Sequence, residues 1–307
     1  MSLRGFILRT LRFAFDLRSW RAGLRAARLP SLVIAAGSCG LGVALAYRDG
    51  RGDILNAAAV MVAGLALQAG VNLVNDFFEF RQKRVNDKVS HLGFSSDDRE
   101  FLEVLIFLVG LAFFGLAGLV GLFLAWRTSW SLLALGAFGF AGGFFYTGEP
   151  FNYKRRGLAV LLVFFLMGVL MVAGSYYAVA RTMSAAVIFQ SIPLSLLVSL
   201  ILLGNELRDF ESDTHYGIRT LAVRIGYRQA VILFGSLAVA AYAGAGVLSA
   251  VGLLPRPWLV LLAAPFFVPP LLFTRRPPQR RAPLIPLIML HHLAFGALFC
   301  LTYFISA

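Results

Sequence analysis

Eleven of the chain's 15 acidic residues lie in two short segments. Seven fall between Asp76 and Glu103, and four fall between Glu206 and Asp213. Acidic side chains are costly to place near the interior of a membrane and tend to mark functional sites there. Because the sequence before both segments is strongly apolar, these two clusters are the first candidates for chemistry.

The first segment places polar side chains on one face of a helix. It reads Asn-Leu-Val-Asn-Asp-Phe-Phe-Glu-Phe-Arg-Gln-Lys-Arg from Asn72 to Arg84. At 3.6 residues per turn, four of its polar side chains fall within about 60° of one another: Asn72, Asp76, Glu79 and Lys83. They form a narrow polar stripe on a helix that is otherwise aromatic and aliphatic.

The second segment repeats the pattern 133 residues later. It reads Asn-Glu-Leu-Arg-Asp-Phe-Glu-Ser-Asp from Asn205 to Asp213. Asn205, Asp209 and Asp213 again fall on one helical face, within about 80°. Both segments contain Asn-x-x-x-Asp at the end of an apolar run, which suggests a parallel internal repeat.

These residue types predict a metal site. Carboxylate and amide oxygens on facing helices suit Mg²⁺, which commonly bridges to the phosphates of a substrate. The two cysteines lie far apart, so no sulfur-rich set favours zinc. Several carboxylates around one cavity would repel each other strongly unless cations lay between them.

Basic residues accompany both stripes and suit a polyanion: Lys83, Arg84, Lys154, Arg155, Arg208 and Arg219. Two metal-binding stripes, a basic rim and an apolar bundle together indicate a diphosphate attached to a long hydrocarbon. The alternative is that the charges are solvated helix ends and salt bridges between helices. Two matching stripes favour the functional interpretation.

The elements that position these residues are membrane helices. The chain has 307 residues, of which 59% are apolar and 14% charged, against roughly 45–50% and about 25% in soluble domains. This excludes a soluble enzyme and a disordered chain, and predicts an all-α membrane bundle.

A bilayer core takes about 20 apolar residues per helix, and nine stretches qualify: 30–47, 54–78, 102–126, 131–147, 158–180, 185–206, 229–252, 258–273 and 284–305. Pro265, Pro269 and Pro270 predict a kink in the eighth.

The charge distribution predicts the orientation. Of the 28 Lys and Arg residues, 23 fall on one side of these nine stretches. By the positive-inside rule, the N-terminus and both acidic clusters face the cytoplasm of a multi-pass membrane protein. The net charge of +13 is thus explained by topology, and we expect no nucleic-acid partner. Residues 1–29 are predicted to form a basic amphipathic segment on the membrane lipid, followed by a transmembrane domain over 30–307 with cytoplasmic caps at about 80–101 and 208–228.

Several motifs resemble the UbiA superfamily of intramembrane aromatic prenyltransferases, over nearly the whole chain. The second acidic motif, followed by Gly-Ile-Arg-Thr-Leu-Ala-Val-Arg-Ile-Gly at 217–226, is its most specific part. Segments 24–30 and 146–158 are similar to the sequence before the family's first helix and to its helix 4–5 loop. Gly-Ser-Tyr-Tyr at 174–177 resembles the branch that prenylates 1,4-dihydroxy-2-naphthoate for menaquinone.

The resemblance implies a nine-helix enzyme that needs Mg²⁺, and two ions are expected. The implied metal ligands are Asn72, Asp76, Glu79, Asp87, Asn205, Asp209 and Asp213, of which Asp76, Glu79, Asp209 and Asp213 are also the implied catalytic residues. The implied contacts with diphosphate or acceptor are Lys83, Arg84, Tyr146, Tyr153, Lys154, Arg208 and Arg219.

The first motif departs from the family pattern. Glu79 stands where an aspartate is usual, and Lys83 stands at the third acidic position. Asp87, four residues further on, is the substitute for that third acid. The loop after the fourth span carries Ala159 and Val160 where glycine and an acid are usual.

The expected activity is transfer of a polyprenyl group from its diphosphate to an aromatic acceptor, 1,4-dihydroxy-2-naphthoate. Alternative acceptors are 4-hydroxybenzoate, homogentisate and a tetrapyrrole alcohol. An alternative of another class is a transporter whose acidic residues bind cations or lipid without chemistry, which the Lys83 substitution keeps open.

Overall fold

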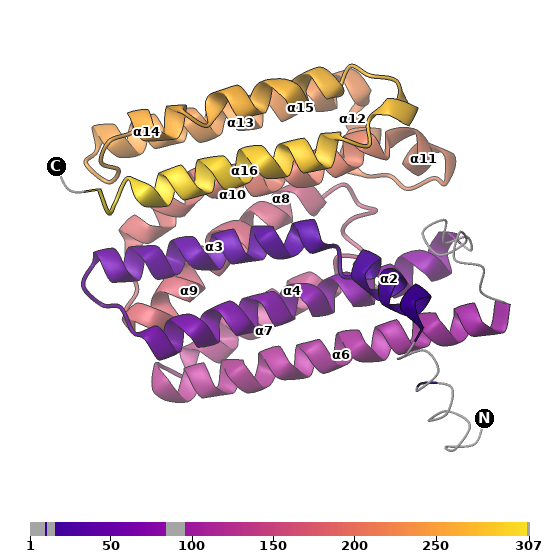
Figure 1. The fold of residues 1–307 in the computed structure, drawn as a ribbon, viewed down its shortest axis with the longest axis horizontal. Coiled ribbons are helices and arrows are strands. Elements are labelled where there is room, and N and C mark those ends of the chain that lie inside the picture. Colours follow the sequence, from indigo (N-terminus) through magenta and orange to yellow (C-terminus); the bar gives the residue numbers. More distant parts are fainter. Residues whose placement is uncertain (1–9, 11–15, 84–95, 306–307) are drawn as a thin grey trace.

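The protein is described by a computed structural model that covers residue 10 and residues 16–83 and 96–305 (Figure 1). Over these ranges the secondary structure is entirely helical. Seven helical segments within them are long and apolar enough to cross a membrane. They are α3 (Leu29–Arg48), α4 (Ile54–Lys83), α6 (Ser96–Arg127), the continuous run α8 (Ala159–Val163), η1 (Phe164–Leu170) and α9 (Met171–Ala180), then α10 (Ala185–Arg208), α13 (Tyr227–Ala250) and α16 (Leu284–Leu301).

The other two expected spans are shorter apolar helices. Helix α7 (Ser131–Phe144) has 14 residues, about 21 Å at 1.5 Å per residue, so its helical part falls short of a hydrocarbon core of about 30 Å. The segment 258–273 is broken into α14 (Trp258–Leu261), η2 (Ala264–Phe267) and α15 (Val268–Phe273). The expected kink is present, because prolines lack the N–H and crowd the preceding turn.

Helix α10 is the centre of the bundle. Two thirds of the residues in its most apolar stretch are buried (67%), compared with 17% for the corresponding stretch of α6. It packs against α13, α16 and the α8–η1–α9 run, whereas α6 packs mainly along α4. The acidic cluster that ends α10 is therefore held by the best-packed helix, and α6 presents most of its surface outward.

One end of the bundle gathers the segments that follow the acidic helices. The ends of α4 and α10 lie there with α2 (Leu17–Ala26), α11 (Phe210–His215) and α12 (Leu221–Ile225), at the right of Figure 1. Ala22 and Ala26 of α2 pack against Leu73 and Phe101 of α4 and α6. The expected cap over 80–101 coincides with the end of α4 and the start of α6, while residues 84–95 lie outside the described ranges.

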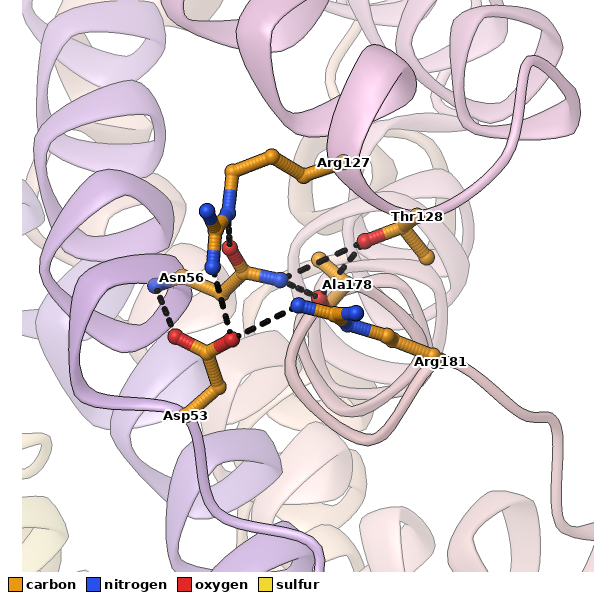
Figure 2. A network of polar contacts seen from close by, with 6 residues as sticks. All are labelled: Asp53, Asn56, Arg127, Thr128, Ala178 and Arg181. Carbon is orange, nitrogen blue, oxygen red and sulfur yellow. Dashed lines mark hydrogen bonds and ion pairs between the residues drawn. The ribbon is translucent and has the colours of Figure 1, made fainter.

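The opposite end of α4 is fixed by a polar network (Figure 2). Asp53 Oδ2 accepts hydrogen bonds from Arg127 and Arg181, each at 2.9 Å, and its Oδ1 accepts the backbone N–H of Asn56 at 3.0 Å. Asn56 donates in turn to the carbonyl oxygen of Ala178 at 2.7 Å. The N–H of Asn56, followed by the two guanidinium groups, lowers the pKa of Asp53 below its usual value. Helices α4, α6 and α9 are thereby joined at this end.

Candidate active site

The two acidic stripes line one cavity. It has a volume of about 640 Å³ and lies among α3, α4, α7, η1, α10 and α11. Asn72 and Asp76 line it from α4, Asn205 from α10, Asp209 from the junction of α10 and α11, and Asp213 from α11. Side chains separated by more than 130 residues in the sequence therefore face the same space.

Asn72 joins α4 to the first turn of α3 and to the residues just before it. Its buried side chain donates to the carbonyl oxygen of Ala27 at 2.7 Å and to Ser31 Oγ at 2.6 Å. Its Oδ1 accepts a hydrogen bond from Gln68 at 3.0 Å. Since an amide oxygen has two lone pairs, Oδ1 can accept one bond more.

Asp76 lies one turn further along α4 and is buried, with 3% of its surface exposed. Its neighbour Asn75 is also buried and accepts a hydrogen bond from Thr147 Oγ1. This bond ties the loop after α7 to α4, and Tyr146 of the same loop also lines the cavity.

Asp209 and Asp213 occupy the junction between α10 and α11. Both oxygens of Asp209 accept hydrogen bonds from Arg208, Nε to Oδ1 at 2.7 Å and Nη2 to Oδ2 at 2.6 Å. Asp213 is buried at 4% exposure. Its backbone N–H donates to the carbonyl of Asp209, and its own carbonyl accepts the N–H of Ile218. The short helix α11 is thus held as a continuation of α10.

The loop after α7 supplies aromatic and basic side chains. Tyr146 and Tyr153 stack edge to face at 5.4 Å, and the Lys154 ammonium lies 5.8 Å from the centre of the Tyr146 ring, within cation–π range. All three line the cavity. Burial, followed by the neighbouring Tyr146, raises the pKa of Tyr153 above its usual value. Tyr153 therefore stays a neutral donor, and its hydroxyl donates to the carbonyl of Gly142.

Helix α12 packs against that same loop. Arg224 donates to the carbonyl oxygens of Arg219 at 2.9 Å and Arg155 at 3.1 Å. A Cβ on Gly157 would come within 2.5 Å of the Arg224 side chain, and Gly157 has a φ of +73°. Only glycine combines a positive φ with so close an approach of the Arg224 side chain at low cost.

The remaining sequence-predicted residues have different placements. Arg219 is exposed and is not among the residues that line the cavity. Glu79 and Lys83 belong to the last turns of α4, but their side chains lie outside the described part of the structure. Arg84 and Asp87 fall in 84–95, which is outside it altogether.

The lining also includes residues that were absent from the predicted site, among them two that adjoin the stripes. Asn75 sits on α4 next to Asp76, and Glu206 sits on α10 next to Asn205. Glu206 is buried, and its Oε2 accepts the N–H of Ala222 at 2.9 Å, which caps α12. Each is about 100° around the helix from its neighbour in the stripe, so the one-face criterion passes over it. The signal that could have identified both residues is that each lies within one of the two dense polar segments, Asn75 in the first and Glu206 in the second.

The inner part of the cavity is apolar. Its wall includes two glycines of α7, Gly139 and Gly143, and a set of aliphatic and thioether side chains: Leu67, Val71, Val163, Leu166, Met167 and Met171. Leu166 and Met167 come from η1, a π-helical stretch, and such stretches often occur at functional sites. A charged end and a hydrophobic interior therefore belong to one cavity.

A profile of the UbiA prenyltransferase family matches residues 34–299. The chain belongs to the UbiA prenyltransferase family. The family prediction made from the sequence motifs is confirmed, and the protein is a prenyltransferase. With its apolar helices, this UbiA protein is also a multi-pass membrane protein.

Curated relatives of this UbiA protein carry one name in three bacteria, 1,4-dihydroxy-2-naphthoate octaprenyltransferase. The Bacillus subtilis protein is 30% identical over 227 residues, 73% of each chain. The Mycobacterium tuberculosis protein is 31% identical over 249 residues, 80% of this chain and 82% of the relative. The Escherichia coli protein is 30% identical over 308 residues, 94% and 96% of the two chains.

Solved structures share the fold. A UbiA homologue from Archaeoglobus fulgidus superposes with a TM-score of 0.61 at 13% identity, covering 92% of this chain and 97% of the homologue. The same homologue bound to GPP and Mg²⁺ gives a TM-score of 0.57 at 12% identity, covering 92% and 99%. At these identities the likeness concerns the arrangement of the helices.

Proposed function

We propose that this UbiA prenyltransferase transfers a polyprenyl group from its diphosphate to 1,4-dihydroxy-2-naphthoate. The observation that supports this proposal most directly is that two acidic stripes, from α4 and from α10–α11, line one cavity whose interior is apolar. Such a cavity suits a ligand that is strongly anionic at one end and hydrocarbon at the other. The names of the three bacterial relatives and the Gly-Ser-Tyr-Tyr segment at 174–177 support this acceptor.

The donor atoms around the charged end fit Mg²⁺, because carboxylate and amide oxygens are its preferred protein ligands. The proposed ligands are Asn72, Asp76, Glu79, Asp87, Asn205, Asp209 and Asp213, and the proposed number of ions is two. The A. fulgidus structure with GPP and Mg²⁺ supports the pairing of this ion with a prenyl diphosphate in the family. When bound, Mg²⁺ would neutralise negative charge that develops on the departing diphosphate.

The basic side chains are proposed to bind the rest of that charge. Arg208 and Lys154 line the cavity at the charged end. Guanidinium and ammonium groups bind phosphate oxygens by charge-assisted hydrogen bonds. Lys83, Arg84 and Arg219 are proposed as additional phosphate contacts from the neighbouring segments.

The bonds that change lie between these groups and the apolar wall. The allylic C–O bond of the donor breaks with its electron pair on diphosphate, and the allylic carbon forms a C–C bond with the electron-rich ring. The acceptor carboxylate leaves as CO₂ in the overall reaction. Leu166 and Met167 help to exclude water, so that the ring captures the allylic cation in place of hydrolysis. Tyr146 and Tyr153 are proposed to orient the diphosphate or the acceptor.

The placement in the membrane is part of the proposal. Nine crossings, counting α7 and the broken α14–α15 segment, put the N-terminus and the charged end of the cavity in the cytoplasm by the positive-inside rule. Residues 1–29 are then proposed to lie on the inner leaflet. A reporter fusion at each terminus, which is active on one side of the membrane only, tests this orientation.

The function is tested by label transfer. Purified protein in detergent receives a labelled polyprenyl diphosphate, Mg²⁺ and one acceptor from a panel of 1,4-dihydroxy-2-naphthoate, 4-hydroxybenzoate and homogentisate. We expect transfer to the naphthoate, and its loss in Asp76→Ala and Asp209→Ala variants that still fold. Full turnover in either variant contradicts the site. Cation binding without transfer to any acceptor favours the transporter alternative.

A further inference from the structure

Glu206 is a buried carboxylate that has one oxygen in use. Its exposed fraction is 4%, and Oε2 accepts the N–H of Ala222 at 2.9 Å. Its Oε1 is buried and has no hydrogen-bond partner. Native proteins rarely keep a buried polar atom in this state unless water, an ion or a ligand satisfies it.

The position of Glu206 specifies where that partner would be. The residue lies between Asn205 and Asp209 in the last turns of α10, and all three line the same cavity. It interacts electrostatically with Lys154 and Asp213. Glu206 therefore belongs to the charged end of the lining, among residues already proposed to hold a cation.

The helix cap explains only part of this arrangement. An N-terminal cap needs one acceptor atom, which Oε2 provides. The fixed Oε2 restrains the carboxylate plane, and restraint of this kind orients metal ligands in many proteins. The cap leaves Oε1 buried and without a hydrogen-bond partner, in a residue that belongs to the cavity lining.

We propose that Oε1 of Glu206 is a further carboxylate ligand for the divalent cation at the second acidic cluster, an inference that rests on the proposed function. Glu206 then links two events. Its Oε1 binds the cation, and its Oε2 holds α12, which packs on the loop that carries Tyr146 and Lys154. Loading of the cation and the position of that loop are coupled through one side chain.

The test measures cation binding directly. Purified protein in detergent, without donor or acceptor, is titrated with Mn²⁺, and the free ion is followed by electron paramagnetic resonance. Glu206→Gln keeps an oxygen that accepts the N–H of Ala222 but removes the charge. The matched control is Glu211→Gln, which removes one charge from the same cluster at a side chain that binds Arg281 and does not line the cavity.

We expect Glu206→Gln to weaken Mn²⁺ binding at least about tenfold, and Glu211→Gln to change it less than about twofold. The unfolding temperature of Glu206→Gln without metal should match that of the unaltered protein. If Glu206→Gln fails to fold, Glu206→Asp replaces it, and the same loss of affinity is expected because the shorter side chain withdraws the oxygen.

Two results overturn the proposal, and they are distinguishable. Unchanged Mn²⁺ affinity in a folded Glu206→Gln variant removes Glu206 from the ligand set, while label transfer by the unaltered protein leaves the proposed function in place. Absence of Mn²⁺ binding in the unaltered protein removes both.

Discussion

Arg208 holds both carboxylate oxygens of Asp209, the next residue in the chain, at 2.7 and 2.6 Å. The two side chains are 35% and 44% exposed. Ion pairs in such exposed surroundings contribute little net stability. The pair is therefore easily exchanged, and a cation on Asp209 would leave the Arg208 guanidinium available for a diphosphate.

This exchange predicts opposite effects of one substitution on two ligands. Arg208→Gln should raise the KM for the polyprenyl diphosphate about tenfold, since a charge-assisted contact to phosphate is lost. Mn²⁺ affinity should stay the same or increase, because Asp209 loses its competing partner. Steady-state kinetics and Mn²⁺ titration of the same preparation measure both. An unchanged KM together with weaker Mn²⁺ binding would show that Arg208 supports Asp209 and does not bind the donor.

A second prediction separates the structural and the ligand roles of Asn72. Its amide N–H groups donate to Ala27 and Ser31, and the residue lines the cavity. Asn72→Asp keeps an oxygen ligand but cannot donate to the Ala27 carbonyl. It should lower the free energy of unfolding by about 1–3 kcal/mol and preserve Mn²⁺ binding, whereas Asn72→Ala should impair both. Denaturant titration in detergent gives the first quantity. Equal stability of Asn72→Asp and the unaltered protein would contradict the anchoring role.

Helical periodicity accounts for what the sequence could predict about the site. It placed Asn72 with Asp76, and Asn205 with Asp209, on single faces, and the cavity has all four on its wall. The contacts of Asn75 and Glu206 depend on segments distant in sequence, Thr147 in one case and α12 in the other. No local pattern encodes such pairings.

The fold likewise has features that the local sequence predicts and features that depend on contacts between distant segments. Apolar length predicted the helices, and the prolines of 258–273 predicted the break between α14 and α15. The π-helical η1 was not predicted. It approaches α10 closely at Gly168, where a Cβ would lie 2.3 Å from Ser195 Oγ, and no local sequence pattern reports such a contact. The motifs predict Arg219 as a phosphate contact, and its side chain is exposed just before α12.

The Asp53 network predicts a pH dependence of stability. The pKa of Asp53 is lowered in the folded protein, first by the Asn56 N–H and then by Arg127 and Arg181. A lowered folded-state pKa gives stability that is complete above the unfolded value of about 3.9 and is lost as the pH falls through the folded value. The unfolding temperature should therefore exceed that of Asp53→Asn by a constant margin from pH 7 to about pH 5, and the margin should shrink below about pH 4. A margin that grows on acidification would contradict the assignment.

A final prediction concerns the hydrocarbon end of the cavity. Gly139 lines it, and a Cβ there would meet only Leu170, at an ordinary 3.9 Å. Gly139→Leu should therefore fold, with the rest of its side chain occupying space that a long donor needs. We expect kcat/KM for octaprenyl diphosphate to fall about tenfold or more, as happens when a pocket loses room for a few methylenes, while kcat/KM for geranyl diphosphate changes little. The control Gly115→Leu adds the same side chain to an open, exposed position on α6 and should affect neither donor. An equal loss with both donors would mean that Gly139 is needed for the packing of α7 and does not determine which donor length the cavity accepts.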